Sequence, residues 1–375
     1  MAGLLPHVDP DGLLEYSVVY TDRALNHMSA SFQGVMKDIS ALLKQVYGAQ
    51  AAIVVPGSGT YGMEAVARQF ATGKKCLVIR NGWFSFRWTQ IFEMGNIPSE
   101  AHVLKARRSE ASAQAPFAPV PLAEAQAAIR DMRPDLVFAP HVETASGMML
   151  PDDYIKGLAD AVHEHGGMLM LDCIASGAMW VNMQQTGVDV LISAPQKGWS
   201  ASPCAGLVML NDRALAAIEH TQSTSFACDL KKWLQIMQTY ENGGFAYHAT
   251  MPTDALKQLR DAIQEAQKVG FDTLKAQQAE LGARVRALLV AKGFPSVAAA
   301  GFQAPGVVVS YTRDAGMQSG KKFTELGLQI AAGVPLQCDE GSDFQTFRLG
   351  LFGLDKLADI DRTINTFEKT LNSIA

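Results

Sequence analysis

Short apolar segments alternate with helical patterns between residues 51 and 210, and this alternation constrains the fold more than any other feature of the chain. Six segments have the composition and length of buried strands: AAIVV (51–55), KCLVIR (75–80), DLVFA (135–139), MLMLD (168–172), VDVLIS (188–193) and GLVML (206–210). Helical patterns separate several of them, at 62–71, 121–132 and 151–166. Strands joined by helices of this length form βαβ units, which predicts an α/β fold with a mostly parallel sheet.

The C-terminal part of the chain contains a second, smaller set of expected elements. These are an amphipathic helical region (254–293), three strands (306–312, 328–333 and 346–352) and a closing helix (355–374). The chain has 375 residues, of which 48% are apolar, and this is enough for more than one hydrophobic core. We therefore predict an N-terminal arm (1–25), a large domain (26–255) and a small α/β domain (256–375).

Charge and hydropathy exclude several classes of function. The net charge is −5 and the basic residues form no cluster beyond KARR at 105–108, so we expect no nucleic-acid partner. No apolar run approaches the roughly 18–20 residues of a membrane span, and the N-terminus lacks the basic flank of a signal peptide. The five cysteines are dispersed without a CxxC pair, which favours reduced thiols in a cytoplasmic protein. His163 and His165 have no third ligand nearby in the sequence, so we expect no metal site.

Ligands of doubly wound sheets bind beyond the carboxyl ends of the strands, so the residues that follow each apolar segment are the candidates for a site. The first strand is followed by PGSGTYG (56–62), which opens a helix. Its glycines permit a tight backbone turn, and Ser58 and Thr60 place hydroxyls beside the free N–H groups of the helix. This pattern is typical of an anion cradle for a phosphate. A strand–helix turn also needs glycine for geometry alone.

The next two strands are followed by aromatic and hydroxyl residues. NGWFSFRW (81–88) carries four aromatic side chains, which either cover the core or stack on a flat ligand. HVETASG (141–147) offers Thr144 and Ser146, whose hydroxyls either bind a ligand oxygen or satisfy local turn backbone. Neither segment decides between its two interpretations by itself.

The last two strands of the series lead to an acid and a lysine. Asp172 ends MLMLD, where a carboxylate either caps a turn or holds a cation such as a protonated ring nitrogen. Lys197 follows VDVLIS among small residues. A single lysine is usually a surface residue, but a partly desolvated lysine is suited to forming a Schiff base.

Together these five features complement the five parts of pyridoxal 5′-phosphate. The cradle matches its phosphate, the aromatic residue its ring face, the hydroxyl its phenolic oxygen, Asp172 its pyridine nitrogen and Lys197 its aldehyde carbon. A lysine Schiff base with a partner on the ring nitrogen is the general pattern of proteins that use this cofactor. The combination therefore predicts a pyridoxal-phosphate enzyme.

The chain resembles the class V aminotransferases of fold type I, and most closely their alanine/serine–glyoxylate branch. Four segments carry the resemblance: PGSGTYGMEA (56–65), NGWFSFR (81–87), HVETASG (141–147) and LMLDCIASGAMWVNMQQTGVDVLISAPQKGWSASPCAGLVML (169–210). The similarity covers roughly residues 25–360. It implies a large domain with a mostly parallel seven-stranded sheet, a smaller C-terminal α/β domain, and a homodimeric assembly with active sites at the interface.

The resemblance also implies roles for individual residues. Lys197 is the implied Schiff-base lysine and Asp172 the partner of the pyridine nitrogen, and these two form the catalytic pair. Phe84 occupies the family's stacking position, although its neighbour Trp83 is a rival for that role. Thr144 is expected at the phenolic oxygen. The implied phosphate-binding residues are Ser58, Gly59, Thr60 and Gln196, joined across the dimer interface by Tyr247 and Thr250.

The substrate-binding end departs from the family pattern. Arg348 in FRLGLFG matches the arginine that grips the substrate's α-carboxylate, although an ordinary ion-paired arginine is the alternative. The family commonly opens with a Gly/Pro-rich loop, whereas residues 13–29 here contain no glycine or proline between Leu13 and Ser29. We expect side chains of this bulkier segment to contact the substrate. The candidates are Tyr16, Ser17, Tyr20 and Arg23.

The predicted reaction is a ping-pong transamination from a small amino acid, such as alanine or serine, to a 2-oxoacid such as glyoxylate or pyruvate. A 2-aminoethylphosphonate–pyruvate aminotransferase is the first alternative, because the changed segment at 13–29 alters the substrate pocket. A lyase or desulfurase is less favoured. Gln196 precedes the lysine where desulfurases usually have histidine, and Cys338 is a weak candidate for the acceptor thiol. A catalytically silent regulator on the same scaffold is the remaining alternative.

Overall fold

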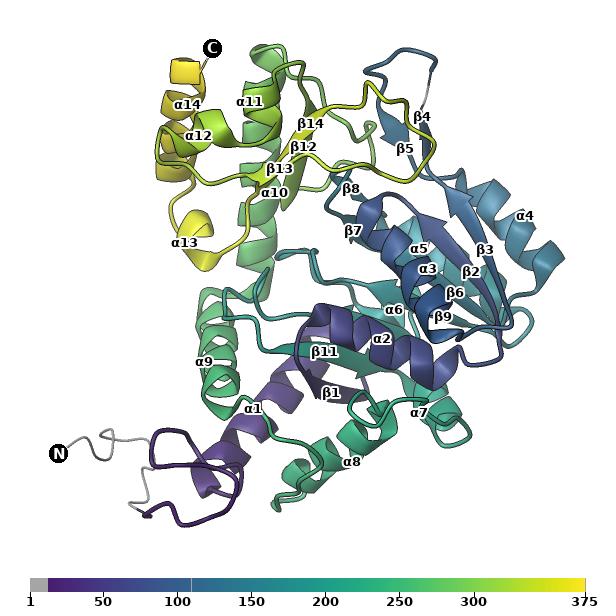
Figure 1. Cartoon of the computed structure of the whole chain (residues 1–375), viewed down its shortest axis with the longest axis vertical. Coiled ribbons are helices and arrows are strands. Elements are labelled where there is room, and N and C mark those ends of the chain that lie inside the picture. Colours follow the sequence, from purple (N-terminus) through teal and green to yellow (C-terminus); the bar gives the residue numbers. More distant parts are fainter. Residues whose placement is uncertain (1–12, 109, 375) are drawn as a thin grey trace.

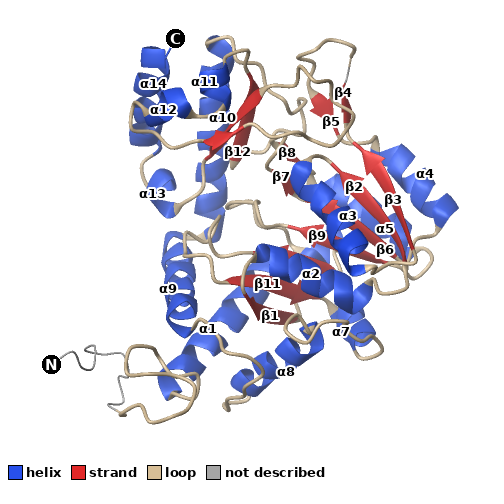
Figure 2. Ribbon diagram, in the orientation of Figure 1, coloured by secondary structure: helices blue, strands red, loops and turns tan. Residues whose placement is uncertain are grey.

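A seven-stranded sheet forms the centre of the larger part of the molecule (Figures 1 and 2). The computed structural model describes residues 13–108 and 110–374. In spatial order the strands are β1 (Ala51–Pro56), β11 (Ala205–Leu210), β10 (Val190–Ser193), β9 (Met168–Asp172), β6 (Leu136–Pro140), β2 (Lys75–Arg80) and β3 (Glu100–Lys105). β11 runs antiparallel to its neighbours β1 and β10, whereas β10, β9, β6, β2 and β3 pair in parallel. The mostly parallel sheet predicted from the sequence is confirmed.

Helices cover both faces of this sheet, because the chain adds parallel strands toward both of its edges. The connection β2–α3–β3 moves toward one edge and β6–α5–β9 toward the other, so right-handed crossovers place α3 (Trp83–Gly95) and α5 (Asp152–His163) on opposite faces. In Figure 1, α3 lies in front of the sheet together with α2 (Gly59–Phe70), and α5 lies behind it. With both faces covered, every residue of β6, β9, β10 and β11 is buried.

The C-terminal part of the chain builds a smaller antiparallel sheet with its own core. Its strand order is β12 (Val307–Tyr311), β14 (Thr346–Gly350) and β13 (Ala331–Ala332). The sheet packs with α10 (Phe271–Ala291) and α14 (Ile360–Ile374) around buried side chains such as Phe323 and Phe347. β13 is shorter than the predicted strand at 328–333. The predicted closing helix is divided into α13 (Leu354–Leu357) and α14.

Two long helices connect the two cores. The helical region predicted at 254–293 is interrupted at Gly270, whose φ of 98° lies outside the helical range, and this residue separates α9 (Thr253–Val269) from α10. Leu256 and Leu259 of α9 belong to the core of the large sheet, whereas Leu281 of α10 belongs to the smaller core. The domain boundary near residue 255 stays a prediction.

The N-terminal arm, residues 13–29, forms no helix or strand and lies beside the start of α9 (Figure 1). The Tyr20 hydroxyl donates to the Met251 carbonyl at 3.1 Å, and the Leu25 N–H donates to the Asp254 carboxylate at 3.1 Å. Residues 1–12 of the predicted arm lie outside the described residues. Within the described residues, no helix combines the length and apolar character needed to cross a membrane.

Among the remaining helices and strands, α4 (Leu122–Met132) confirms the helix predicted at 121–132. The helices are α1 (Ala30–Tyr47), α4 (Leu122–Met132), α6 (Met183–Thr186), α7 (Asp212–Ile218), α8 (Leu230–Glu241), α11 (Ala315–Gln318) and α12 (Lys321–Thr324). The strands are β4 (Arg107–Arg108), β5 (Phe117–Ala118), β7 (Val142–Glu143) and β8 (Met148–Met149).

Candidate active site

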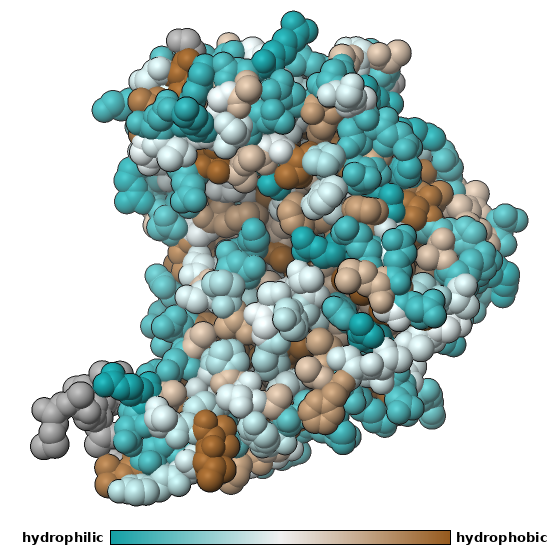
Figure 3. Space-filling model, viewed as in Figure 1, coloured by the Kyte–Doolittle hydropathy of each residue, from teal (hydrophilic) through white to brown (hydrophobic). Residues whose placement is uncertain are grey.

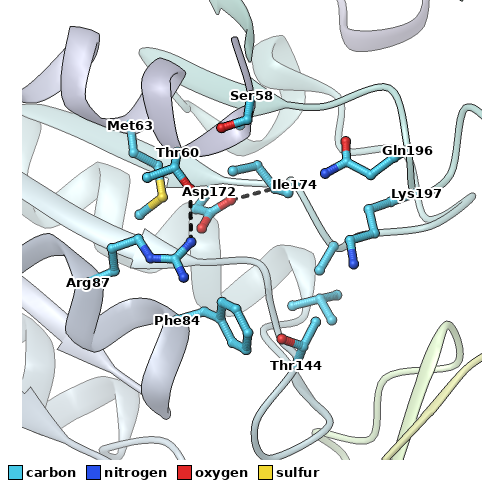
Figure 4. A pocket seen from close by; sticks show the side chains of 13 residues that line it. Ser58, Thr60, Met63, Phe84, Arg87, Thr144, Asp172, Ile174, Gln196 and Lys197 are labelled. Carbon is cyan, nitrogen blue, oxygen red and sulfur yellow. Dashed lines mark hydrogen bonds between the residues drawn. The ribbon is translucent and has the colours of Figure 1, made fainter. Parts of the chain in front are cut away.

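One pocket gathers most of the side chains singled out in the sequence, at the carboxyl ends of the central strands (Figure 4). It is lined by Ser58, Gly59, Thr60, Met63, Phe84, Arg87, Val142, Thr144, Asp172, Ile174, Ala175, Gln196 and Lys197. These residues come from the start of α2, the first turn of α3, and the segments that follow β6, β9 and β10. The fold thus brings together eight predicted site residues that are far apart in the chain.

The start of α2 forms the end of the pocket suited to an anion. Ser58 is the N-cap residue with an extended backbone, and within the described part of the chain its hydroxyl makes no capping bond to the helix. A Cβ atom on Gly59 would lie 2.6 Å from Cδ1 of Ile174, so a larger residue there would force the Ile174 side chain to move. The free N–H groups of the first helical turn therefore face the pocket without an obstructing side chain.

Asp172 lies at the carboxyl end of β9 with its carboxyl group buried. The Ile174 N–H donates to its Oδ1 at 2.9 Å. Burial raises the pKa of Asp172 to about 7, and the nearby charge of Glu143 adds to this effect, while the Ile174 hydrogen bond and Arg87 oppose it. A carboxyl group in this state would be stabilised in its ionised form by a cation placed against it.

Lys197 occupies the turn after β10, at the other end of the pocket from α2 (Figure 4). Its Nζ atom lies 5.3 Å from the centroid of the Phe352 ring. Burial, followed by the positive charge of Arg348, lowers the pKa of Lys197 below its ordinary value. A lowered pKa increases the fraction of neutral amine, which is the nucleophilic form. A Cβ on the next residue, Gly198, would lie 2.1 Å from the Gly177 carbonyl oxygen, so the turn requires glycine there.

Phe84 rather than Trp83 faces the pocket. Phe84 lines it, whereas Trp83 is absent from the described lining residues and packs 5.7 Å, centroid to centroid, from Phe86. The aromatic residues belong to a helix, since Trp83 is the first residue of α3. Phe84 therefore projects from the first helical turn, next to Thr144 in the view of Figure 4.

Glu143 is a buried residue that the sequence analysis did not select, and it fixes the position of Phe84. Its carboxylate accepts hydrogen bonds from the Phe84 N–H at 3.2 Å, the Ser85 N–H at 2.8 Å, the Ser85 hydroxyl at 2.7 Å and the Ala145 N–H at 3.0 Å. It thereby satisfies the free N–H groups at the start of α3. The sequence signal for Glu143 was its position inside HVETASG (141–147), a segment that carries the family resemblance.

Arg87 is the second residue that the sequence analysis missed. It lines the pocket three residues after Phe84, on the same side of α3, and donates to Thr60 Oγ1 at 2.9 Å. Its guanidinium carbon lies 5.1 Å from the centroid of the Phe84 ring. Figure 4 shows it pointing between Thr60 and Asp172. Recognition of a helix start at Trp83 would have placed Arg87 beside Phe84.

Arg348 lies beside the pocket on β14 of the smaller sheet. Its Nε donates to the Ala332 carbonyl at 2.7 Å, and one terminal nitrogen approaches the Thr144 carbonyl at 3.5 Å. The guanidinium carbon is 5.8 Å from the Phe84 ring centroid. These contacts hold the side chain at the Lys197 side of the site and leave further N–H donors for an anion.

The remaining predicted site residues are not brought to this pocket within one chain. Tyr247 and Thr250 lie on an exposed loop before α9, with their hydroxyl oxygens 3.0 Å apart. Tyr20 lies close to the same loop, and Tyr16 is 89% exposed on the arm. Figure 3 shows apolar side chains on the molecular surface near the arm.

The residues that line the pocket fit pyridoxal 5′-phosphate. Thr144 Oγ1 and Gln196 Oε1 are buried without a hydrogen-bond partner among the described residues, and both belong to residues lining the pocket. Buried polar atoms of this kind normally have partners, so they indicate a polar ligand. The helix N-terminus, the buried acid and the lysine supply the other complementary groups.

The structure provides neither a metal cluster nor an accessible thiol at this site. Among residues 13–108 and 110–374, no group of three or more His, Cys, Asp or Glu side chains is arranged to hold a metal ion. Cys338 is buried, its thiol donates to the Arg80 carbonyl at 3.4 Å, and burial raises its pKa to about 12. A buried, protonated thiol is poorly suited to act as a sulfur acceptor.

Comparisons with known proteins agree with the geometry. The chain is 30% identical to the 2-aminoethylphosphonate–pyruvate transaminase of Paraburkholderia phymatum, covering 92% of this chain and 89% of that protein. It is 27% identical to the alanine–glyoxylate aminotransferase of Rattus norvegicus, over 67% of this chain and 58% of the relative. The solved alanine–glyoxylate aminotransferase of Nostoc sp. has the same fold, with a TM-score of 0.79, 20% identity, and coverage of 93% of this chain and 88% of that one.

The family model described as aminotransferase class-V matches residues 13–308, well over half of the sequence. This match includes the start of α2, the first turn of α3 and both Asp172 and Lys197. It confirms the family resemblance inferred from the sequence segments. The chain belongs to the class-V aminotransferase family.

Proposed function

We propose that this enzyme transfers the amino group of a small amino acid, such as alanine or serine, to glyoxylate or pyruvate. The observation that carries the proposal is the placement of Asp172 and Lys197 at opposite sides of one pocket, with Arg348 beside the lysine. When bound, pyridoxal 5′-phosphate supplies an aldehyde that takes up the amino group and a ring that accepts electrons. The chain supplies binding, orientation and proton transfer.

The two ends of the pocket have separate tasks in this proposal. Asp172 pairs with the protonated ring nitrogen, which stabilises the ionised carboxylate that burial otherwise disfavours. With the cofactor bound, the Lys197 Nζ atom would lie at its aldehyde carbon. Nζ would accept the proton from the α-carbon of the amino donor and would return it as the product forms.

The neighbouring side chains orient the reactants. Phe84 stacks on the ring face, Thr144 binds the phenolic oxygen, and Gln196 contributes to the phosphate site with the start of α2. Arg348 binds the α-carboxylate of the substrate through the N–H groups that its backbone contacts leave free. A single arginine at this end favours substrates with one anionic group near the reacting carbon.

The proposal includes a homodimer located in the cytoplasm. Tyr247 and Thr250 are exposed, lie together, and do not line the pocket of their own chain. Hydroxyls in this arrangement are suited to contact the phosphate in a second copy of the chain. Tyr16 and Tyr20, which lie near the same loop, are proposed to reach the substrate side of the partner's pocket.

A 2-aminoethylphosphonate–pyruvate aminotransferase is the second candidate. The relative from Paraburkholderia phymatum has that name and covers nearly the whole chain. Its donor carries one anionic group, a phosphonate, which an arginine also binds. Arg348 would then hold the phosphonate rather than a carboxylate.

The test is a single-turnover assay of purified enzyme loaded with pyridoxal 5′-phosphate. Alanine, serine, aspartate and 2-aminoethylphosphonate are added separately without an acceptor, and loss of the yellow colour of bound cofactor is followed together with release of the carbonyl product. We expect alanine or serine to react fastest. A faster reaction with 2-aminoethylphosphonate would select the second candidate, and no reaction with any donor would contradict transamination and favour a silent regulator.

A further inference from the structure

Arg87 lines the pocket, but the proposed function gives it no part in binding or proton transfer. Of the residues that line the pocket, two carry a positive charge, Arg87 and Lys197. Figure 4 shows the Lys197 amine on the far side of the pocket from the Arg87 guanidinium. The charge of Arg87 is therefore directed at the end that Ser58 and Thr60 form.

Two contacts and one charge interaction hold Arg87 at that end. Its terminal nitrogen donates to Thr60 Oγ1 at 2.9 Å, and its guanidinium carbon lies 5.1 Å from the centre of the Phe84 ring. It also faces the buried carboxyl group of Asp172, whose ionised form its charge favours. Because Phe84 and Arg87 are three residues apart in α3, the helix presents both side chains to the same space.

The charge balance of the phosphate end gives Arg87 its function. Ser58, Gly59, Thr60 and Gln196 offer only neutral donors and the partial charge of the α2 N-terminus, which corresponds to roughly half an elementary charge. A phosphate group carries between about one and two negative charges near neutral pH. Arginine presents several N–H donors in a planar arrangement that matches phosphate oxygens, and only one of them is used by Thr60.

We propose that Arg87 is the positively charged ligand of the cofactor's phosphate, held in place by Thr60 and by the face of Phe84. This inference rests on the proposed function, since it concerns the same pocket. The Arg87 guanidinium comes from α3, whereas the free N–H groups of the phosphate end come from the start of α2. The guanidinium thus contacts both Thr60, at the phosphate end of the site, and Phe84, which faces the place of the cofactor ring.

The experiment compares two ligands that differ only in the phosphate. Dissociation constants of pyridoxal 5′-phosphate and of pyridoxal are measured by tryptophan fluorescence on cofactor-free wild type and on Arg87→Gln. We expect Arg87→Gln to weaken binding of pyridoxal 5′-phosphate by roughly 10- to 100-fold, as for a lost hydrogen bond to a charged group. Its affinity for pyridoxal should stay within about threefold of wild type, and Arg87→Lys should give an intermediate loss.

Inorganic phosphate provides a second readout that involves no cofactor ring. It should raise the thermal unfolding temperature of the cofactor-free wild type and have a much smaller effect on Arg87→Gln. Arg130→Gln is the matched control, because Arg130 lies on the exposed face of α4 in an ion pair with Glu164. This control should bind pyridoxal 5′-phosphate and pyridoxal with the same affinities as wild type.

The outcomes separate this inference from the proposed function. Equal losses for pyridoxal 5′-phosphate and pyridoxal would show that Arg87 only supports Phe84 and would overturn the inference. A wild type that does not bind pyridoxal 5′-phosphate would overturn the proposed function instead. If Arg87→Gln does not fold, Arg87→Met keeps the apolar stem against Phe84 and tests the same difference between the two ligands.

Discussion

The cofactor pocket and the arm surface, which comprises residues 13–28 and 244–252, position their side chains in different ways. In the pocket, Asp172 and Lys197 are held at the ends of buried strands of one sheet. On the arm surface, Tyr20 contacts the Met251 carbonyl, and His27 lies 5.6 Å from the Tyr247 ring, centroid to centroid. The two parts of the arm surface contact each other but do not line the pocket of the same chain.

This difference separates what one chain determines from what it leaves to an assembly. Strand ends in a sheet with both faces covered are fixed by the packing of the whole core, so their side chains converge whether or not a partner is present. On the arm, Tyr16 is 89% and Val18 is 102% exposed. Exposed apolar side chains beside exposed hydroxyls fit a surface that a second molecule covers. We expect pocket substitutions to abolish chemistry and arm substitutions to act through the proposed dimer.

The largest effect is expected for Lys197→Ala. Without Nζ, no side chain at this point of the pocket moves the proton at the donor's α-carbon, and the rate of transamination should fall by roughly a thousandfold or more. The steady-state rate with alanine and glyoxylate measures this loss. Circular dichroism should match wild type, since the side chain is half-buried and makes no contact that the core depends on. Retention of more than about a tenth of the activity would remove Lys197 from the mechanism.

Asp172→Asn should cause the next largest loss, roughly 100-fold in the rate, because a neutral amide does not keep the ring nitrogen protonated. The loss should appear in kcat more than in the affinity for the amino donor, since Asp172 does not touch the donor. Steady-state kinetics with varied donor measure this separation. An equal change in both parameters would assign Asp172 a merely structural role.

The same carboxyl group makes the stability of the cofactor-free enzyme depend on pH. Its folded pKa of about 7 exceeds its ordinary value of 3.8, so the folded state binds the proton more tightly. The contribution of Asp172 to the free energy of unfolding is greatest below about pH 4. It decreases by a few kcal/mol as the pH rises toward 7. Denaturant unfolding between pH 4 and 8 should show this decrease for wild type but not for Asp172→Asn. Saturation with pyridoxal 5′-phosphate should remove most of it.

Glu143→Gln should weaken the pocket indirectly. One carboxylate oxygen accepts from the Phe84 and Ala145 N–H groups and the other from the Ser85 N–H, and the amide NH2 that replaces either oxygen leaves its donors without an acceptor. The free energy of unfolding should fall by roughly 1–3 kcal/mol, and cofactor affinity should fall because Phe84 is held less firmly. Urea unfolding measures the first effect and cofactor titration the second.

The control for this substitution is Glu124→Gln, which changes the same residue type in an exposed ion pair with Arg107. Its unfolding free energy should remain within about 0.5 kcal/mol of wild type. Wild-type stability in Glu143→Gln would show that the start of α3 holds its shape without the carboxylate.

Much of the pocket could be predicted from the sequence because its residues follow recognisable strands. Asp172 ends one buried apolar segment and Lys197 lies four residues after another, and parallel strands bring their carboxyl ends to one edge. Arg87 and Glu143 were missed for one physical reason. The start of α3 has Gly82 at the N-cap, and its capping acceptor is Glu143, 58 residues further along than Ser85. The N-cap position therefore holds glycine instead of the Ser, Thr, Asp or Asn side chain that usually caps a helix start.

The arm surface could not be predicted to the same depth. Tyr16 and Tyr20 were selected because residues 13–29 depart from a family pattern, and nothing in that pattern specifies which pocket they approach. The break at Gly270 was missed because the apolar periodicity continues across α9 and α10, although the glycine leaves the helical range there. Predicting such features requires the tertiary packing, or the partner, that makes them favourable.

The smallest effect, about tenfold, is expected for the double substitution Tyr247→Phe with Thr250→Val, through weaker cofactor binding. Mixed dimers test where these hydroxyls act. When subunits carrying Lys197→Ala are mixed with subunits carrying the double substitution, a mixed dimer contains one pocket that combines an intact lysine with intact hydroxyls from its partner. Activity at limiting cofactor should then exceed that of either parent. If the hydroxyls act within their own chain, mixing adds nothing, and the arm surface would have no part in the active site of a second subunit.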